Sequence, residues 1–559
     1  MVYIYSKKSE LNKYIGKELE TEKIKEILVD LGMDLKGETK ETDPELKIEI
    51  TAEKMDLIST CGIARAIKFY DSIENKIPQY EIKKSNLTLI VEESVENIRP
   101  KTVAAILKNV PMNKDFLDEI IKIQEKMHDS FGRNRKKAAI GIYPLEKIKF
   151  PIFYKAKKPE DILFQPLESS TQMNGIEILT NHETGKKFSH LLKDLNKYPI
   201  FIDSNNSILS MPPIINSHNT GRVDLEHKDL FIECSGHNLN HLDNILKVLV
   251  STFIDMGAEA QSICVEYPNN QIYELNLEPQ EFEINYNYVN KLIGTNLTKE
   301  EIIKLLPKVL FELKEIKEDK LILNIPCFKT DIFNDCDIAD DIARAYGYNN
   351  IIPKFPNVTS IGEELDFSNF KNNITNTLIS LGFIELYTYM LCSSKDQFEN
   401  FLREEEKEEF LKINDSANEG INMLRTLILP ENLKSLNINR KNKYPQKVFE
   451  NGFTLQVDKT QETGAINQSN LAISIADPKA NFTQIKEIFD TINTLYELDL
   501  KLEESEHKFL ILGRQANILN KNKQIIGFIG ELHPQVLENF GIIVPICSIE
   551  MNLNKAFKK

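Results

Sequence analysis

Four aspartates in one short stretch limit most strongly what this chain can fold into. Asp331, Asp337, Asp340 and Asp341 lie in the run IPCFKTDIFNDCDIADDIARAYGYNNI, which spans residues 325–351. If a helix begins at Asp337, the last three side chains project from one arc of that helix about 100° wide, because residues at i, i+3 and i+4 share a face. Asp331, one short turn upstream, can fold back onto the same patch. Converging carboxylates call for a hard cation, so the pattern predicts a site for Mg²⁺.

A second interpretation of these aspartates needs no metal. Asp337 can be the N-cap of the helix, with Asp340 and Asp341 in its first turn, where negative charge complements the helix macrodipole. On spacing alone the capping interpretation is the stronger of the two. The surrounding sequence, considered below, shifts the balance towards the metal.

The composition is typical of a soluble protein with several domains. A chain of 559 residues is too long for one core and predicts about three to five domains. The chain has no run of 18 or more apolar residues, and its first residues lack the apolar core of a signal peptide, so we expect no membrane span and no secretion. The seven cysteines include no C-x-x-C pair, which argues against a zinc site or a disulfide framework and favours the cytoplasm.

The net charge of −15 weighs against this chain as the main binder of a nucleic acid, because phosphate contacts need clustered Lys and Arg. Two basic stretches exist, and solvated loops are the simpler interpretation of both. They consist of Arg133, Arg135, Lys136 and Lys137, and of Arg440, Lys441 and Lys443. If the protein works on RNA, most positive surface must come from a partner or from local patches.

The pattern of apolar residues predicts a multidomain α+β protein. Residues 1–84 form a small α/β domain, and strands alternate with helices over 85–276. Residues 277–354 carry the aspartates, and Thr298 with Glu301 predicts a capping box there. Residues 361–559 form one antiparallel α+β domain.

Three elements of this last domain are predicted from local signals. A helix over 366–381 ends at Gly382, and the run FIELYTYMLC over 383–392 predicts a strand. The acidic run 403–410 predicts a helical stretch with a solvated face. Strands are predicted in QKVFENGFTLQV, NLAISIA, KFLILG, QIIGFIG and VPICSIEMNL.

Motifs along nearly the whole chain resemble the β subunit of phenylalanine–tRNA ligase, of the archaeal and eukaryotic type. They are K-T-D-x5-D-x2-D-D (329–341), PPIIN (212–216) and IGELHPQVLENFG (529–541). In that family the four acidic residues of the first motif bind magnesium, and Asp340 stands where Glu is common. The resemblance implies an editing domain at 85–276, a winged-helix-like acidic module at 277–354, and a class II synthetase-like domain at 361–559.

The editing domain of that family hydrolyses tyrosine wrongly joined to tRNA, without a protein nucleophile. On the family pattern the candidate residues are Ser210, Asn216, Glu233 and Ser235. The last two depart from the usual Asp-x-Thr, because Glu233 extends its carboxylate about one bond further. Ordinary polar residues at strand ends remain the alternative interpretation of all four.

The class II resemblance raises the question of whether residues 361–559 activate an amino acid. Class II enzymes hold ATP with an Arg and a Glu on one strand and with an Arg on a later glycine-rich element, because an arginine fork matches phosphate oxygens. Here KVFENG retains Glu450 but has Lys447 and Val448 where the arginine is needed, and GFIGELHP has Glu531 in place of the cation. We therefore predict an inactive, degenerate copy of the fold.

The resemblance implies a β subunit that works with a catalytic α subunit, two copies of each, in the ATP-dependent attachment of phenylalanine to tRNA(Phe). ATP and phenylalanine would bind through the α subunit. A free-standing tRNA-editing hydrolase is the alternative, although such an enzyme has no use for an inactive synthetase domain. A scaffold or nucleic-acid-binding module is a third possibility.

Overall fold

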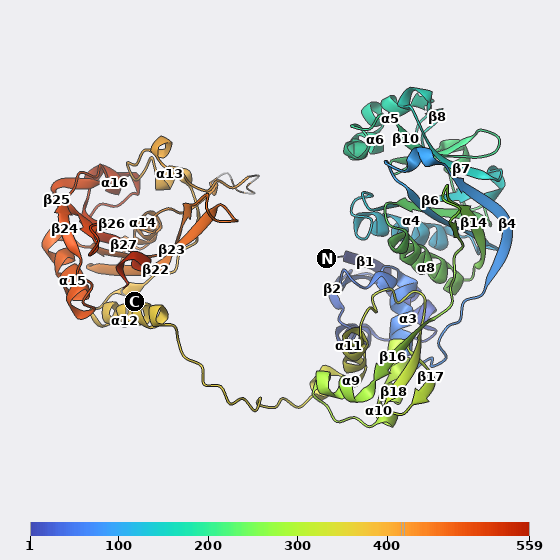
Figure 1. Ribbon diagram of the computed structural model, residues 1–559, viewed down its shortest axis with the longest axis horizontal. Helices are drawn as coiled ribbons and strands as arrows, with labels where there is room; N and C mark the ends of the chain where they lie inside the picture. The colour runs from blue at the N-terminus through green and yellow to red at the C-terminus, as the bar shows by residue number, and fades with distance from the viewer. Residues whose placement is uncertain (1, 415, 417, 419, 558–559) are drawn as a thin grey trace. The chain divides into compact units, whose positions relative to one another are not determined.

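Two units with separate hydrophobic cores make up the chain, residues 1–355 and 356–559 (Figure 1). The computed structural model describes residues 2–557, apart from residues 415, 417 and 419. None of the helices in this described part has both the length and the apolar character that a membrane span needs.

The first unit begins with a three-stranded antiparallel sheet in the order β1-β3-β2, covered by three helices. Its central strand alternates buried and half-buried residues, so Leu46, Ile48 and Ile50 all join the core. The elements are β1 (Val2–Lys7), α1 (Lys8–Ile15), α2 (Thr21–Asp30), β2 (Asp34–Glu38), β3 (Glu45–Ile50) and α3 (Thr60–Tyr70).

A ten-stranded sheet follows, in the order β12-β11-β10-β7-β4-β14-β5-β13-β6, with β15 beside β14. Two long helices, α4 (Lys114–Asp129) and α8 (Leu239–Asp255), cover one face of it. The strands are β4 (Ile82–Val91), β5 (Lys101–Lys108), β6 (Ala138–Pro144), β7 (Ile152–Lys157), β10 (Tyr198–Ile202), β11 (Ile208–Met211), β12 (Ile215–Asn216), β13 (Leu230–Gly236), β14 (Glu259–Glu266) and β15 (Ile272–Tyr273). Short helices α5 (Gly175–Asn181) and α6 (Glu183–Phe188) cover a smaller core near β10 and β11.

Strand alternation decides which residues of this sheet meet the long helices. Ile232 and Cys234 pack in the core beneath α4 and α8, whereas Phe231 belongs to the core on the opposite face. Because side chains of a strand alternate, Glu233 and Ser235 lie on the face of Phe231, away from these helices.

The acidic module packs three helices on a second three-stranded antiparallel sheet, in the order β16-β18-β17. The predicted capping box is confirmed, since Glu301 N–H donates to Thr298 Oγ1 and Thr298 N–H donates to Glu301 Oε2. The elements are β16 (Gln280–Asn285), α9 (Tyr286–Ile293), α10 (Lys299–Leu305), β17 (Glu312–Lys317), β18 (Lys320–Ile325) and α11 (Asp335–Tyr346).

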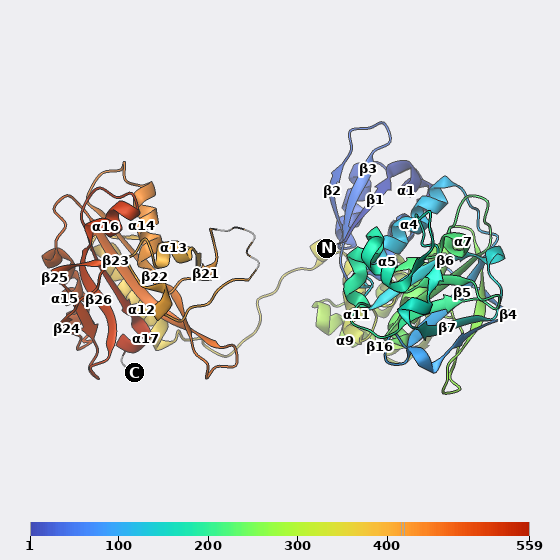
Figure 2. The same ribbon diagram turned by 90° about the horizontal axis from the view of Figure 1, so that it is seen from above.

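The second unit is built on a seven-stranded sheet in the order β19-β22-β23-β27-β26-β25-β24, largely antiparallel (Figure 2). Helices α12 (Asp366–Ser380) and α15 (Phe482–Leu495) pack in one core, while α14 (Leu429–Ile438) and α16 (Pro534–Asn539) pack in another. The strands are β19 (Ile384–Glu385), β22 (Gln446–Val457), β23 (Ala465–Ala476), β24 (Lys501–Glu504), β25 (Leu510–Leu519), β26 (Ile525–Leu532) and β27 (Ile546–Asn552). The predicted helix before Gly382 is confirmed, and this glycine has a φ of 82°.

Two predictions for this unit were wrong. The run 383–392 is not one strand: β19 ends at Glu385, and Leu391–Cys392 form a separate two-residue strand, β20. Between them Thr388 turns to the carboxylate of Glu450, so the chain leaves the sheet edge. The acidic run 403–410 contains only a 3-10 turn at Glu405–Lys407, because neighbouring glutamates repel one another in a helix.

Candidate functional site

A buried carboxylate lies on the face of the ten-stranded sheet that points away from α4 and α8. Glu233, in the middle of β13, is only 2% exposed. Its neighbour across the sheet is Gly141 on β6, and a Cβ atom there would come within 2.4 Å of Glu233 Oε1. The glycine therefore leaves the space that the Glu233 side chain occupies.

Tyr143 joins Glu233 to Ser210. The Tyr143 hydroxyl lies 2.7 Å from Ser210 Oγ and 3.1 Å from Glu233 Oε1, and all three side chains are buried. One hydroxyl carries one proton, so it cannot donate to both neighbours at once. Two arrangements satisfy both contacts: Ser210 donates to Tyr143, which donates to an ionised Glu233, or a protonated Glu233 donates to Tyr143, which donates to Ser210.

The electrostatics of the pocket agree with a neutral Glu233. Burial raises the pKa of this carboxyl to about 8, against the smaller opposing effects of Tyr143 and Arg99. Its second oxygen, Oε2, has no hydrogen-bond partner among the described residues. A buried oxygen without a partner is costly, and it is free to recognise a polar group of a ligand.

The structure brings the other two editing candidates to the same region. Asn216 lies opposite Ser210 in the β11–β12 pairing, so the two side chains share one face of the sheet. Asn216 is half-buried. Ser235 is fully buried, and its Oγ accepts a hydrogen bond of 3.2 Å from Nε of the buried Arg99.

The sequence alone did not identify Tyr143 and Arg99 as residues of this site. The signal that could have found Tyr143 is Gly141, since a lone glycine inside a strand pattern often marks the close approach of another group. No local motif marks Arg99, which meets Ser235 only through the fold.

The acidic module does not bring its four aspartates together. Asp337 Oδ2 accepts hydrogen bonds of 2.8 Å from the backbone N–H groups of Phe333 and Asn334, at the start of α11. Asp340 accepts from Tyr348 and forms an ion pair of 2.7 Å with Arg344. Both carboxylates are therefore committed to helix-end and helix-surface contacts.

Asp331 and Asp341 are buried, but lysines occupy the space beside them. Lys54 Nζ lies 2.6 Å from Asp331 Oδ2 and 3.2 Å from Asp341 Oδ1, and Lys329 Nζ lies 2.8 Å from Asp341 Oδ2. Burial acts to raise the pKa of Asp341, yet Lys329 and Lys54 together hold it at about 2.

These contacts do not fit a magnesium ion held by the four aspartates. Across the described ranges no cluster of three His, Cys, Asp or Glu residues is placed to hold a metal. Asp331 Oδ1 does lack a hydrogen-bond partner, but Mg²⁺ needs near-octahedral oxygen ligands, and two lysine ammonium groups beside these carboxylates would repel it. The capping interpretation accounts for Asp337, although Asn334 rather than Asp337 is the N-cap residue.

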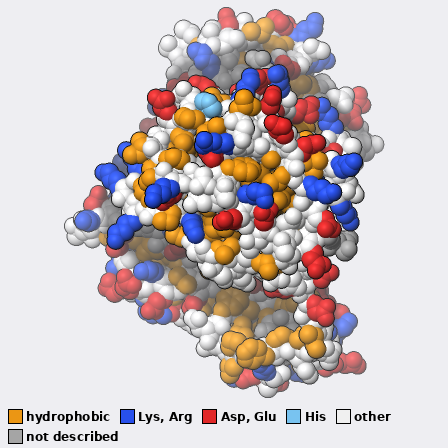
Figure 3. Space-filling view, turned by 90° about the vertical axis from the view of Figure 1, so that its left-hand side faces the viewer, with side chains coloured by type: hydrophobic (Ala, Val, Ile, Leu, Met, Phe, Trp, Pro, Cys, Tyr) orange, Lys and Arg blue, Asp and Glu red, His pale blue; other side chains and the backbone are white. Residues whose placement is uncertain are grey.

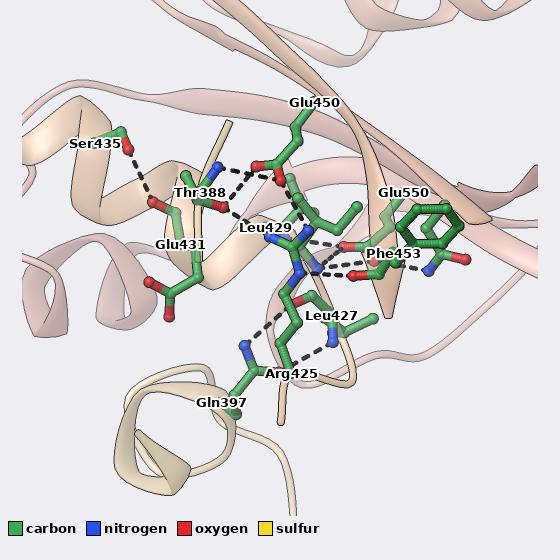
Figure 4. A network of polar contacts seen from close by, with 12 residues as sticks. Thr388, Gln397, Arg425, Leu427, Leu429, Glu431, Ser435, Glu450, Phe453 and Glu550 are labelled. Atoms are coloured by element: carbon green, nitrogen blue, oxygen red, sulfur yellow. Dashed lines mark hydrogen bonds and ion pairs between the residues drawn. The ribbon is translucent and has the colours of Figure 1, made fainter. Parts of the chain in front are cut away.

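In the second unit, buried polar residues of the seven-stranded sheet are bonded to one another (Figure 4). Arg425 and Glu450 form an ion pair of 2.8 Å and are 2% and 1% exposed. Arg425 also donates to Thr388 Oγ1 and to the carbonyl of Phe453. Gly452 leaves room for this guanidinium, since a Cβ there would lie 2.5 Å from Arg425 Nη2.

Two further buried acidic residues of this sheet are also satisfied internally. Glu550 is buried and accepts from the N–H groups of Ile428 and Leu429 and from Asn470. Glu531 accepts from Phe482 N–H and pairs with Arg514 at 2.7 Å.

Comparison with known proteins places these domains in a class. A Phe-tRNA synthetase beta subunit B1 domain matches residues 1–72, a tRNA synthetase B5 domain matches 282–348, and a phenylalanyl tRNA synthetase beta chain CLM domain matches 351–553. The chain is thus a multidomain α+β component of an aminoacyl-tRNA synthetase.

Full-length relatives narrow this class to one family. The phenylalanine–tRNA ligase beta subunit of Pyrococcus horikoshii is 36% identical over 554 residues, 99% of each chain. That of Methanosphaera stadtmanae is 32% identical, over 98% of each chain. A crystal structure of an N-terminal fragment of the P. horikoshii beta subunit matches 62% of this chain and 99% of the fragment, with 37% identity and a TM-score of 0.59. The chain belongs to the phenylalanine–tRNA ligase beta subunits of the archaeal type.

Proposed function

We propose that this chain hydrolyses Tyr-tRNA(Phe) in the region 85–276 and completes a catalytic α subunit with its C-terminal unit, in an assembly of two α and two β chains. The editing proposal depends above all on one observation, the buried Glu233 carboxyl with its unpartnered Oε2. A phenol hydroxyl would supply the missing partner.

The same oxygen explains how tyrosine would be distinguished from phenylalanine. Phenylalanine would bury Oε2 without a partner, and such a polar mismatch gives sharp discrimination. Tyr143 and Ser210 hold the Glu233 carboxyl in place. Asn216, the half-buried candidate, is the one that water and the ester can reach, and we assign it to orienting the attacking water.

The partnership with an α subunit is supported by the internal ion pair of Arg425 and Glu450, which leaves neither group for a nucleotide. Exposed apolar side chains also call for a partner. Figure 3 looks onto the C-terminal unit and shows hydrophobic side chains among charged ones of both signs. The aromatic rings of Tyr387 and Tyr389 in this unit are 94% and 86% exposed.

Ligases of this family are generally magnesium-dependent. We propose that in this chain Asp331 and Asp341 hold the acidic module to the first domain through Lys54, while Asp337 and Asp340 stabilise α11.

The editing proposal is tested in the complex with the α subunit. Glu233→Ala should reduce the preference for Tyr-tRNA(Phe) over Phe-tRNA(Phe) in deacylation, and Asn216→Ala should reduce the rate itself. Ser474→Ala is the control. Ser474 is a buried serine of the second unit, whereas the editing candidates lie in the first, and its hydroxyl forms a hydrogen bond with that of Ser548 in the same unit. Unchanged deacylation in both editing variants would instead support a scaffold role.

A free-standing editing hydrolase remains the second candidate. It predicts that the chain hydrolyses Tyr-tRNA(Phe) alone and does not co-elute with an α subunit in size-exclusion chromatography. Co-elution as a larger assembly would support the subunit proposal.

A further inference from the structure

A basic cleft of about 540 Å³ lies beside the ten-stranded sheet, outside the editing residues described above. It forms where the end of α4, the loop that follows it and α8 meet β1. Lys126, Arg133, Lys137 and His241 line it, together with one carboxylate, Asp129.

These basic groups are not neutralised by ion pairs. In the described part of the chain, no salt bridge involves Lys126, Arg133, Lys136 or Lys137. Such a concentration of free positive charge is unexpected in a chain with a net charge of −15. Unpaired lysine and arginine side chains around a hollow attract phosphate groups.

The loop that carries Arg133 and Lys137 is rigid rather than loose. Lys137 N–H donates to Gly132 O at 2.8 Å, and Arg135 N–H donates to His128 O at 3.1 Å. A Cβ at Gly132 would come within 2.6 Å of the carbonyl of Ala138, so the glycine allows this close turn.

The same loop contains backbone strain. Arg133, Asn134 and Arg135 have φ values of 47°, 51° and 65°, a left-handed conformation that non-glycine residues rarely adopt three times in succession. Strain of this kind persists where the surrounding structure holds it, and it concentrates at functional sites. The loop thus presents its charges in one fixed arrangement.

Two contacts connect the loop to the editing residues. Arg99 donates to the carbonyl of Lys136 at 3.2 Å and, through Nε, to Ser235 Oγ. At the end of β13, a Cβ on Gly236 would lie 2.3 Å from the carbonyl of Lys137. The cleft lies on the side of α4 and α8, and the loop joins it to the end of β13, the strand whose Glu233 and Ser235 side chains lie on the opposite face of the sheet.

We propose that this cleft binds the phosphates of the single-stranded end of an RNA substrate and leads that end towards the editing residues. Two partly buried aromatic side chains, Tyr3 and Phe131, line the cleft beside the charges, and single-strand binding uses such rings for base stacking. Lys47 lies 4.4 Å from the centre of the Tyr3 ring and adds further positive charge. This inference rests on the proposed editing function for the direction in which the RNA runs.

The test measures binding of a fluorescent single-stranded RNA oligonucleotide to the αβ complex by anisotropy, at several salt concentrations. The double variant Arg133→Ala and Lys137→Ala should lower the slope of log affinity against log salt by about 1.4, at about 0.7 for each lost phosphate contact. Extrapolated from 1 M salt, this is a loss of about 25-fold in affinity at 0.1 M.

Two further variants make the result specific. Lys186→Ala with Lys187→Ala removes two exposed lysines from α6 and should leave the slope unchanged. The double variant Arg133→Lys and Lys137→Arg keeps both charges and should retain RNA binding. Retained binding would show that the alanine variant loses affinity because it loses charge. An unchanged salt slope in the alanine variant overturns the inference.

Deacylation of Tyr-tRNA(Phe) by the same variants separates this inference from the editing proposal. If both hold, the alanine pair raises KM and leaves kcat close to that of the wild type. If the wild-type complex binds RNA through the cleft but hydrolyses no Tyr-tRNA(Phe), the RNA site stands and the editing proposal fails. If hydrolysis is present and KM does not change in the variant, the cleft inference fails and editing stands.

Discussion

At the scale of single residues, protonation and charge pairing explain the two buried networks. In the first, burial raises the pKa of Glu233, and the neutral carboxyl can donate to Tyr143 while Tyr143 donates to Ser210. In the second, Arg425 is tolerated in the interior because Glu450 and two further oxygen acceptors surround it. Each network predicts a response to substitution.

The first prediction concerns the pH dependence of Glu233. Its pKa is raised by burial from 4.5 to about 8, so its contribution to stability is fully present below about pH 4.5 and is lost as the pH rises towards 8. Glu233→Gln stays neutral at every pH. Between pH 5 and 8 the free energy of unfolding of the wild type should therefore fall relative to that of the variant, by at most about 1.4 kcal/mol per pH unit, and the melting temperatures should follow the same trend. A difference that stays constant with pH would contradict a protonated Glu233.

The second prediction concerns the ion pair of the second unit. Arg425→Met leaves the buried Glu450 without its cation and should destabilise this unit by about 3–5 kcal/mol in urea unfolding. Adding Glu450→Gln removes the orphaned charge, so the double variant should recover part of the loss. A double variant less stable than Arg425→Met alone would show that the pair does not act as described.

At the scale of elements, the start of α11 decides between the capping and metal interpretations of the aspartates. Asp337 accepts two backbone N–H groups at this helix end, whereas Asp331 and Asp341 face Lys54 from the first domain. The acidic module and the first domain are thereby joined through a buried cluster of charges.

The third prediction follows from this helix end. Asp337→Asn should cost about 0.5–2 kcal/mol, as loss of a cap does, and the fall in melting temperature should be equal in magnesium chloride and in EDTA. Asp335→Asn is the matched control, since it changes the same first turn without those two backbone contacts, and its effect should be smaller. A fall seen only with magnesium would restore the metal interpretation.

Sequence patterns predicted the elements whose signals are local. Thr298 and Glu301 form a capping box because both partners lie within one turn, and Gly382 ends α12 through its positive φ. The prediction of one strand over 383–392 was wrong because Thr388 donates a hydrogen bond to Glu450, a residue 62 positions away. The lysine beside the aspartates could not be predicted for the same reason: Lys54 lies 277 residues before Asp331, and no pattern around the aspartates indicates this contact.

The editing candidates show the same difference between local contacts, which a sequence pattern can predict, and contacts between distant residues, which it cannot. Ser210 and Asn216 come from one short motif, and the structure pairs them across β11 and β12. Tyr143, which joins Ser210 to Glu233, reaches them only once β6 and β13 pair. The resemblance predicted the carboxyl and hydroxyl residues, but the only signal for Tyr143 in the sequence is the glycine two residues before it, Gly141.

At the scale of the whole molecule, the two units have different tasks. The first unit carries the editing candidates and the basic cleft, and the second, which matches the CLM domain, has a seven-stranded sheet with buried charged residues that bond to one another. The central claim is that this second unit does not activate an amino acid and that an α subunit must do so.

The most direct measurement of that claim is ATP–pyrophosphate exchange with phenylalanine, carried out on the purified chain and on the chain co-expressed with its α subunit. We expect exchange only in the complex, because Arg425 is paired with Glu450, and Glu531 is bonded to Arg514 and Phe482 N–H. Exchange catalysed by the chain alone would contradict the account.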